Sequence, residues 1–263
     1  MTVAGSDSGA GAGIQADLKT FAALGVYGTS VLTAITAQNT RGVLAIAEVP
    51  EEVVALQIDA VLEDIGADAA KTGMLSSASI VEVVADRLEA WGVDKLVVDP
   101  VMIAKSGDQL LQPDAADALR AKLLPLALIV TPNLPEAEVL ASRQIVDDED
   151  VRDAARAIAA LGPRIVVVKG GHHQGAPIDV VFDGSAFHEL AGERVVTTNT
   201  HGTGCTFSAA IAAHLAHGRD PLVAIGAAKQ FITEALTASF PIGGGHSPVN
   251  HFHGVQSLAL EPR

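Results

Sequence analysis

Residues 1–24 read MTVAGSDSGAGAGIQADLKTFAAL, an apolar segment, a glycine-rich segment and an amphipathic segment in that order. Met1–Ala4 indicates a strand and Gly5–Gly13 a loop, and Ile14–Leu24 indicates a helix because its apolar residues recur at positions 14, 18, 21 and 24. A strand that leads through a glycine-rich loop into a helix is a building unit of parallel α/β sheets. We therefore expect an α/β fold.

The same alternation of strand and helix continues along the chain. The patterns predict strands at Thr29–Ala37, Ala67–Thr72, Leu96–Val98, Ala127–Val130 and Ile165–Val168, a hairpin of Ile178–Phe182 and Ala186–Leu190 around Asp183-Gly184, and a short strand at Arg194–Val196. They predict helices at Glu51–Leu62, Ser76–Trp91 (capped by Ser76), Pro113–Leu123, Pro135–Leu140, Asp150–Leu161, Gly202–His217 and Pro221–Ala238. This pattern predicts a mostly parallel sheet covered by helices on both faces, in one domain of residues 1–263.

Composition excludes several classes of partner. The chain has 17 basic and 31 acidic residues, a net charge of −14 at pH 7, and only 3% aromatic residues, which opposes binding to nucleic acid or to an anionic membrane. One cysteine excludes an intrachain disulfide and suits a reducing compartment. The first basic residue is Lys19, so no signal peptide is expected, and the uncharged run 20–40 contains Gln38 and Asn39, so no membrane span is expected. We expect a cytoplasmic protein.

Chemically suggestive residues follow the predicted strands. They are Gly5, Gln38, Gly73, Asp99, Asn133 and Lys169. In open α/β sheets, ligands bind beyond the carboxyl ends of the strands. These positions therefore predict where a site lies.

The segment Asn199–Thr206 reads NTHGTGCT and opens the apolar, helical stretch Phe207–Leu215. Glycines at a helix start leave backbone N–H groups unpaired, and together with the helix dipole they attract phosphate oxygens. The only cysteine, Cys205, stands at the same place, where a thiolate is stabilised. The alternative for Cys205 is a small buried apolar residue. The arrangement predicts phosphoryl transfer.

The glycine-rich loop Gly5–Gly13 is not a dinucleotide-binding fingerprint, because Ile14 occupies the position of the third glycine and residues 33–39 contain no carboxylate. It is either a flexible turn or a substrate loop. We favour the substrate loop, with Asp17 on the first helical turn facing the same cleft.

Asp99 precedes a proline at a strand end, and Asn133 and Glu136 follow another strand. Their oxygens suit hydrated Mg²⁺, which binds through a few protein ligands plus water. The alternatives are a turn residue for Asp99 and a helix-dipole charge for Glu136. Lys169 precedes two glycines, which would let a ligand approach the backbone closely. The alternative interpretation of Lys169 is a solvated lysine without a role in a site.

Several motifs occur in the order known from one enzyme family. They are Ala4–Asp7, Gly13–Thr20, Ala37–Gly42, Lys105–Asp108, Thr131–Ala137, Asn199–Thr206 and Pro248–His253. From residue 2 to about 254 the chain resembles the hydroxymethylpyrimidine/phosphomethylpyrimidine kinases of the ribokinase-like superfamily. The resemblance implies a three-layer αβα fold with a small β lid, formed by Arg41–Glu48 and Ala104–Gln109. It also implies a homodimer.

The implied reaction is phosphorylation by ATP, with Mg²⁺, of 4-amino-5-hydroxymethyl-2-methylpyrimidine to its monophosphate and then to its pyrophosphate, for thiamine. By this resemblance, an anion hole is formed by Gly202, Thr203, Gly204 and Cys205, with Cys205 as the base. The nucleotide is contacted by Lys169, Asn133, Thr200, Gly202 and Gly204, and Mg²⁺ is organised by Asp99 and Glu136 with Asn133. The pyrimidine pocket is lined by Gly5, Ala12, Asp17, Gln38, Met74 and Val101. The Gln38 amide offers a donor beside an acceptor, which matches a ring nitrogen beside an exocyclic amine.

Two features depart from the family. The chain has fewer residues before Thr2 than its members, so we expect a weak first strand. Ala10 stands where many members have glycine, which costs about 1 kcal/mol if φ is positive there.

Two other functions remain open. A pyridoxal kinase of the same superfamily is one, although its two-cysteine version carries a second cysteine near Ala104 and this chain has only Cys205. The other is a ligand-binding regulator without turnover, which predicts a damaged phosphate site. Lys169, Asp99, Glu136 and Cys205 are all present.

Overall fold

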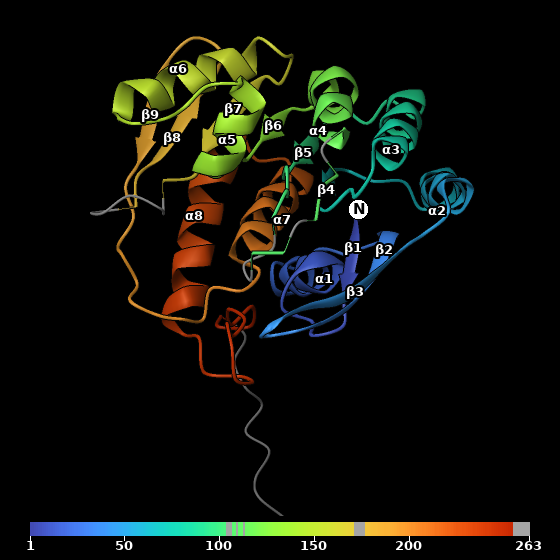
Figure 1. Cartoon of the computed structure of the whole chain (residues 1–263), viewed down its shortest axis with the longest axis horizontal. Helices are drawn as coiled ribbons and strands as arrows, with labels where there is room; N and C mark the ends of the chain where they lie inside the picture. The colour runs from blue at the N-terminus through green and yellow to red at the C-terminus, as the bar shows by residue number, and fades with distance from the viewer. Residues whose placement is uncertain (104–106, 109, 113, 171–176, 255–263) are drawn as a thin grey trace, which may run out of the picture.

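The computed structural model describes residues 1–103, 107–108, 110–112, 114–170 and 177–254 (Figure 1). Over these residues the chain forms a nine-stranded sheet of order β3-β2-β1-β4-β5-β6-β7-β8-β9. The strands are β1 (Thr2–Asp7), β2 (Ser30–Asn39), β3 (Gly42–Glu48), β4 (Ala70–Thr72), β5 (Leu96–Val98), β6 (Ile129–Val130), β7 (Ile165–Val168), β8 (Asp179–Phe182) and β9 (Phe187–Leu190). The strands from β2 to β7 in this order are parallel, and β3, β8 and β9 join the two edges through antiparallel pairs.

Helices cover both faces of the sheet, as the alternating pattern predicts. One face carries α1 (Gly13–Ala23), α7 (Thr203–Ala216) and α8 (Pro221–Thr237). The other carries α2 (Glu51–Asp64), α3 (Ala78–Ala90), α4 (Ala115–Ala118), the π-helical turn η1 (Leu119–Leu123), the 3₁₀ turn η2 (Leu124–Leu126), α5 (Leu134–Ala141) and α6 (Asp148–Ala159). Two separate apolar clusters, one on each face, hold the three layers together.

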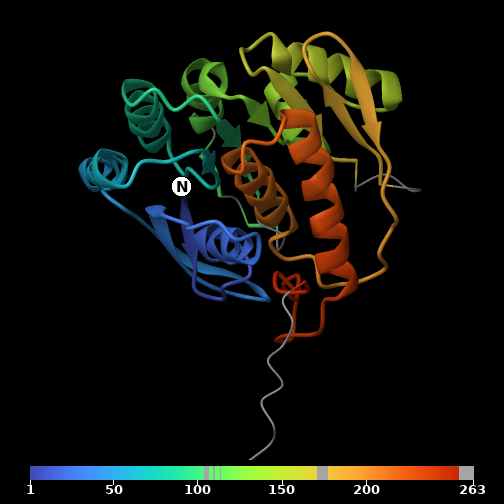
Figure 2. The ribbon, with the colours of Figure 1, turned by 180° about the vertical axis from the view of Figure 1, so that it is seen from behind.

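Helix α7 is the most deeply buried of the described helices. Every residue from Thr206 to Leu215 is buried. It packs on β4 and β5 and lies between α1 and α8 in the helical layer on this face of the sheet (Figure 2). A helix that is apolar all round belongs in a core, and this placement fixes its N-terminus at the carboxyl ends of the central strands.

The first strand is longer than the sequence predicts. β1 runs to Asp7, so Gly5, assigned to the loop, lies within the strand. β1 is also a central strand, because it pairs with β2 on one side and β4 on the other. In a central strand, packing against neighbours outweighs the intrinsic propensity of single residues.

The strand patterns do not predict the edge strand β3. Residues 42–48 belong to the segment assigned to the lid, and they pair antiparallel with β2 from Gly42 to Glu48. Most of these residues are exposed, so no alternation of buried and exposed side chains marks the strand. The pairing with β2 supplies the backbone partners that a sequence pattern alone does not reveal.

Two predictions for short segments are wrong, and a third is only partly correct. Residues 194–196 lie outside the sheet, with Val196 95% exposed, since no described strand lies beside them to pair with. Ser77, not Ser76, occupies the N-cap of α3, and its side chain makes no capping hydrogen bond. The helix predicted at 113–123 is divided into α4 and the wider turn η1, and residue 113 lies outside the described residues.

Ala10 has φ +59°, which confirms the strained backbone expected at this position. Ala10→Gly is expected to raise the free energy of unfolding by up to about 1 kcal/mol, because glycine adopts this conformation without steric cost. Urea denaturation of both proteins measures the difference. Ala22→Gly, on the exposed side of α1, is the control, and it should lower stability by about 1 kcal/mol. A loss of stability in both variants would contradict strain at Ala10.

Candidate active site

The start of α7 lies against the glycine-rich loop. Gly202 is the N-cap of α7 with φ +75°, and a Cβ there would overlap the carbonyl oxygen of Gly11. The Thr203 hydroxyl donates to the Thr200 carbonyl at 2.7 Å, which closes the turn that enters the helix. The conformation therefore requires glycine at 202 and directs the first amides of α7 toward the carboxyl ends of the strands.

Asp7 fixes the glycine-rich loop. Its carboxylate accepts hydrogen bonds from the backbone N–H groups of Gly9 (2.8 Å), Gly11 (3.0 Å) and Ala12 (2.9 Å). It also lies 2.8 Å from His201 Nε2. Burial raises the pKa of Asp7, but the hydrogen bonds from His201 and the loop amides outweigh burial and hold this pKa below its usual value. The loop is thus bound at both ends instead of being a free turn.

Sequence reasoning missed the Asp7–His201 pair. An aspartate just before several glycines was the available signal, since aspartate side chains accept hydrogen bonds from the amides of the following turn. The histidine, 194 residues away, gave none.

Three charged residues meet beside the start of α7, as the sequence predicts. Lys169 Nζ lies 3.1 Å from Asp99 Oδ1 and 3.9 Å from Glu136 Oε2. A Cβ on Gly204 would lie 3.4 Å from Lys169 Nζ and 3.6 Å from Asp99 Oδ2. Burial lowers the pKa of Lys169, but the charges of Asp99 and Glu136 outweigh it and raise this pKa, so the ammonium keeps its charge.

Glu136 is held by the first turn of α5. Its carboxylate accepts from the Asn133 backbone N–H at 2.8 Å, and the Asn133 side chain accepts from the Glu136 N–H at 2.9 Å. This capping box shows that the helix-terminus interpretation of Glu136 is correct and compatible with a site role. Burial, with the nearby charge of Asp99, raises the pKa of Glu136 to about 7 against the opposing charge of Lys169.

The donor set fits a hydrated divalent cation. Asp99 and Glu136 are two buried carboxylates close enough that the charge of one raises the pKa of the other. Mg²⁺ binds through one or two carboxylates together with phosphate and water oxygens. Within the described ranges no cluster of three or more His, Cys, Asp or Glu side chains could hold a metal by itself.

Cys205 lies on the first turn of α7 and is half-buried. Burial raises the pKa of this thiol to about 11, although the charge of Lys71 opposes burial. The expectation of a stabilised thiolate is therefore wrong for the free protein. The cost of burying the thiolate exceeds the stabilisation that the helix start and Lys71 provide.

Asp17 is also placed differently from the prediction. It lies on the second turn of α1 and is fully buried, so it does not face the cleft. Its Oδ2 lies 2.9 Å from Lys71 Nζ and accepts from the Thr2 hydroxyl at 2.6 Å. The periodicity of α1 shows which of its residues point inward. It does not show that a lysine of β4 is buried beside Asp17.

The other residues predicted to line the pyrimidine pocket lie at the carboxyl ends of β1, β2, β4 and β5. Gly5 lies beside Met74, whose sulfur would be 3.1 Å from a Cβ at position 5. Val101 and Ala12 are half-buried. Gln38 is half-buried, its Oε1 accepts from the Thr36 hydroxyl at 3.0 Å, and its amide nitrogen has no hydrogen-bond partner among the described residues.

The predicted lid is only partly described. The turn between β2 and β3 contacts the C-terminal segment, since the His246 N–H donates to the Thr40 carbonyl at 2.7 Å. The Val43 N–H donates to Asp108 at 3.1 Å. The predicted lid segment Ala104–Gln109 is described only at residues 107 and 108, so most of it lies outside the described residues.

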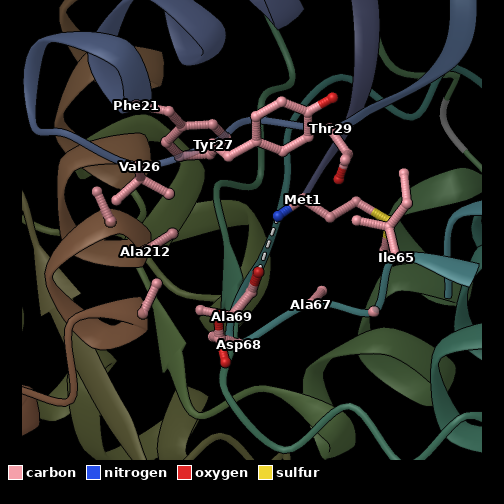
Figure 3. Close-up of a pocket in the computed structure, with 13 residues that line it drawn as sticks. Met1, Phe21, Val26, Tyr27, Thr29, Ile65, Ala67, Asp68, Ala69 and Ala212 are labelled. Carbon is pink, nitrogen blue, oxygen red and sulfur yellow. Dashed lines mark hydrogen bonds between the residues drawn. The ribbon is translucent and has the colours of Figure 1, made fainter.

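A separate cavity of about 340 Å³ lies at the amino ends of the strands, away from these residues (Figure 3). It is lined by Met1, whose amine donates to the Ala69 carbonyl at 2.9 Å, and by Phe21, Tyr27 and Ala212. It contains none of the residues predicted for the site.

In the described part of the chain, no helix has the length and apolar character needed to cross a membrane.

A family model for phosphomethylpyrimidine kinase matches residues 7–250. The chain is 54% identical over 260 residues to the thiamine biosynthesis bifunctional protein ThiED of Geobacter sulfurreducens, covering 98% of this chain and 53% of that protein, so it spans about half of this relative's length. It is 52% identical over 252 residues to the hydroxymethylpyrimidine/phosphomethylpyrimidine kinase of Streptomyces coelicolor, covering 95% of this chain and 93% of that one.

Among solved structures, the chain is similar to a pyridoxal kinase of Bacillus subtilis determined as an ADP complex. The TM-score is 0.89 with 41% sequence identity, and the match covers 95% of this chain and 96% of the other. The ribokinase-like three-layer fold expected from the sequence is thereby confirmed.

Proposed function

The chain belongs to the phosphomethylpyrimidine kinase family and is therefore a phosphotransferase, and we propose that it phosphorylates 4-amino-5-hydroxymethyl-2-methylpyrimidine with ATP, first to the monophosphate and then to the pyrophosphate, for thiamine biosynthesis. One observation carries the proposal: the start of α7, with Cys205, meets Lys169, Asp99 and Glu136 at the carboxyl ends of the parallel strands. This arrangement joins an anion site to a cation and two carboxylates.

Phosphoryl transfer depends on positioning and on stabilising charge. The amides of Gly202, Thr203, Gly204 and Cys205 bind the transferred phosphoryl group, and the Lys169 ammonium neutralises its developing charge. Asn133 and Thr200 flank the nucleotide phosphates. Asp99 and Glu136 would hold Mg²⁺, which supplies a positive charge shared between the nucleotide phosphates when bound.

The acceptor binds on the side of Gln38. The amide nitrogen of Gln38 donates to a ring nitrogen, while its oxygen accepts from the exocyclic amine, which then competes with the Thr36 hydroxyl. Gly5, Ala12, Met74 and Val101 form the walls. Such a pocket disfavours rings that leave the amide unpaired.

Cys205 acts on the alcohol acceptor. The thiol first gives its proton to solvent, and the thiolate then takes the alcohol proton while the alcohol oxygen bonds to the γ-phosphorus and the leaving electron pair goes to ADP. The second acceptor is a phosphate anion that needs no base. A neutral thiol, which the raised pKa of about 11 favours, does not repel that anion.

Cys205→Asp is expected to slow the second phosphorylation more than the first, because a fixed carboxylate repels the phosphate acceptor. Separate kcat/KM measurements with the alcohol and with its monophosphate check this. Cys205→Ser, which is neutral, is the control. An equal loss in both steps would remove the proposed advantage of a thiol.

Pyridoxal is the second candidate acceptor, supported by the similarity to the pyridoxal kinase of Bacillus subtilis. The higher identity to a pyrimidine kinase favours the pyrimidine. The deciding experiment measures ADP release with the pyrimidine alcohol, its monophosphate and pyridoxal side by side. Preference for pyridoxal would overturn the assignment, and no turnover with any acceptor would support a regulator.

A homodimer is part of the proposal. Leu44 and Ile46 of β3 expose apolar side chains on one face at the edge of the sheet, with exposed fractions of 79% and 39%. Apolar surface of this kind suits contact with a second copy. Sedimentation velocity tests it: the wild type should be a dimer that Leu44→Asp weakens, and a monomeric wild type would refute the dimer.

We further infer a single cytoplasmic domain, which the continuous sheet and the net charge of −14 support.

A further inference from the structure

One histidine joins two segments that the proposed reaction must hold in register. The glycine-rich loop, residues 7–13, belongs to the proposed acceptor side, and the start of α7 to the phosphate side. His201 stands just before the N-cap of α7, and its Nε2 lies 2.8 Å from Asp7 Oδ2. Both residues are buried. The ring also packs against the loop, since a Cβ at Gly11 would overlap His201 Cδ2.

The shape of the loop does not depend on this histidine. Asp7 also accepts hydrogen bonds from three backbone N–H groups of the loop, and these remain without His201. The Lys19 ammonium donates to the Ala10 carbonyl at 2.8 Å, which holds the loop to α1. Removing the imidazole therefore leaves the carboxylate hydrogen-bonded and the loop shaped. It weakens mainly the attachment of the loop to the start of α7.

The loop in turn holds the backbone of the residue proposed to recognise the acceptor. The Ser8 hydroxyl accepts from the Gln38 N–H and donates to the Gln38 carbonyl, both at 2.8 Å. Ser8 follows Asp7 directly in the chain. Hydrogen bonds through these two adjacent residues thus connect Gln38, at the end of β2, to His201 at the start of α7.

The backbone of His201 is itself held by the C-terminal segment. Its N–H donates to the Ser247 carbonyl at 3.0 Å, and it forms a parallel β-bridge with Pro248. The N–H of His246 donates to the Thr40 carbonyl at 2.7 Å, in the turn between β2 and β3. With its backbone hydrogen-bonded and its ring buried, the histidine has the fixed position that a group orienting other groups requires.

We propose that His201 is a positioning residue of the kinase, which through Asp7 holds the glycine-rich loop against the start of α7 and so places the acceptor oxygen in line with the phosphoryl group bound there. The inference rests on the proposed function. His201 touches neither acceptor nor nucleotide in this role, and it transfers no proton. Phosphoryl transfer depends on placement, and about 1 Å of misplacement can cost about 100-fold in rate.

His201→Leu removes the hydrogen bond to Asp7 and keeps a side chain of similar size. We expect kcat to fall about 100-fold with the pyrimidine alcohol and with its monophosphate, while the KM values for ATP and for both acceptors stay nearly unchanged. His201→Gln offers an amide N–H that can donate to Asp7 in place of the imidazole, and it should restore most of kcat. A histidine that only stabilised the fold would leave the kcat of the folded protein unchanged.

His251 provides the matched control. It is buried like His201, and its Nε2 lies 3.0 Å from Thr206 Oγ1 of α7. His251→Leu removes a buried histidine hydrogen bond to the same helix instead of to the loop, so it should lower stability to urea and keep wild-type kcat. The inference is overturned by wild-type kcat in His201→Leu, by a His201→Gln as slow as His201→Leu, or by equal losses of kcat in His201→Leu and His251→Leu.

Hydrogen exchange measured by mass spectrometry needs no substrate and separates this inference from the function on which it rests. In His201→Leu the amides of residues 7–13 and 199–206 should exchange faster than in the wild type, because the two segments restrain each other less. Unchanged exchange would overturn the inference. Turnover of pyridoxal alone would overturn the proposed acceptor, and the kcat comparison is then made with pyridoxal. A wild type without turnover of any acceptor would overturn the proposed function.

Discussion

Lys169→Ala is expected to lower kcat by about 100- to 1,000-fold with both acceptors, since removing one donor that stabilises transition-state charge typically costs about 2.7–4 kcal/mol. The Lys169 ammonium lies 3.1 Å from Asp99 and beside the first amides of α7, where the transferred phosphoryl group is proposed to bind. The measurement is steady-state ADP release at saturating ATP. Near-normal turnover would refute the role.

The substitution has a second effect, which the assay must separate from the first. Without Lys169, Glu136 loses the positive charge that opposes its burial, so the pKa of Glu136 rises above about 7 and more of this carboxyl is protonated at neutral pH. Activity should then recover partly as pH rises. Lys122→Ala, at an exposed lysine of η1, is the control and should keep wild-type kcat. Thermal unfolding of each variant shows whether it is folded.

Gly202→Ala is expected to lower the free energy of unfolding by about 2–5 kcal/mol and to remove nearly all activity. Alanine at φ +75° costs about 1–2 kcal/mol, and its Cβ would overlap the Gly11 carbonyl, which adds about 1–3 kcal/mol of overpacking. Relief of the overlap moves the glycine-rich loop away from the first amides of α7. Urea denaturation and ADP release measure the two losses.

The matched control is Gly226→Ala in α8. A Cβ there meets nothing within 4 Å, so alanine should raise stability by about 1 kcal/mol through its higher helix propensity. Wild-type activity and stability in Gly202→Ala would mean that the start of α7 does not depend on its contact with the loop.

The fold and the phosphate side of the site follow from local patterns. Alternating strands and helices predict the parallel sheet, and the rule that ligands bind at the carboxyl ends of strands brings Asp99, Asn133 and Lys169 together from the sequence alone. The position of Glu136 can also be predicted, because a residue of a capping box lies at the start of its helix whatever else it contacts. These features depend on neighbours in sequence.

The remaining features depend on distant packing. Lys71 stands in an apolar strand and gives no sign that Asp17, 54 residues earlier, neutralises it. The raised pKa of Cys205 arises from burial of the thiol, which is a tertiary property. The edge strand β3 escapes prediction for the same reason, since its pairing with β2 determines its structure.

The hydrogen bond between Asp7 and His201 joins residues 194 positions apart. All described strands of the sheet are complete at Leu190, whereas α7 and the histidine follow it. During synthesis from the N-terminus, the strands of the sheet are therefore made before the segment that we propose to bind phosphate. Closing so long a loop carries an entropic cost that only a formed core can offset. The order of translation thus makes catalytic competence a late property of this chain, acquired together with the layer of α7 and α8 that completes the core on one face of the sheet.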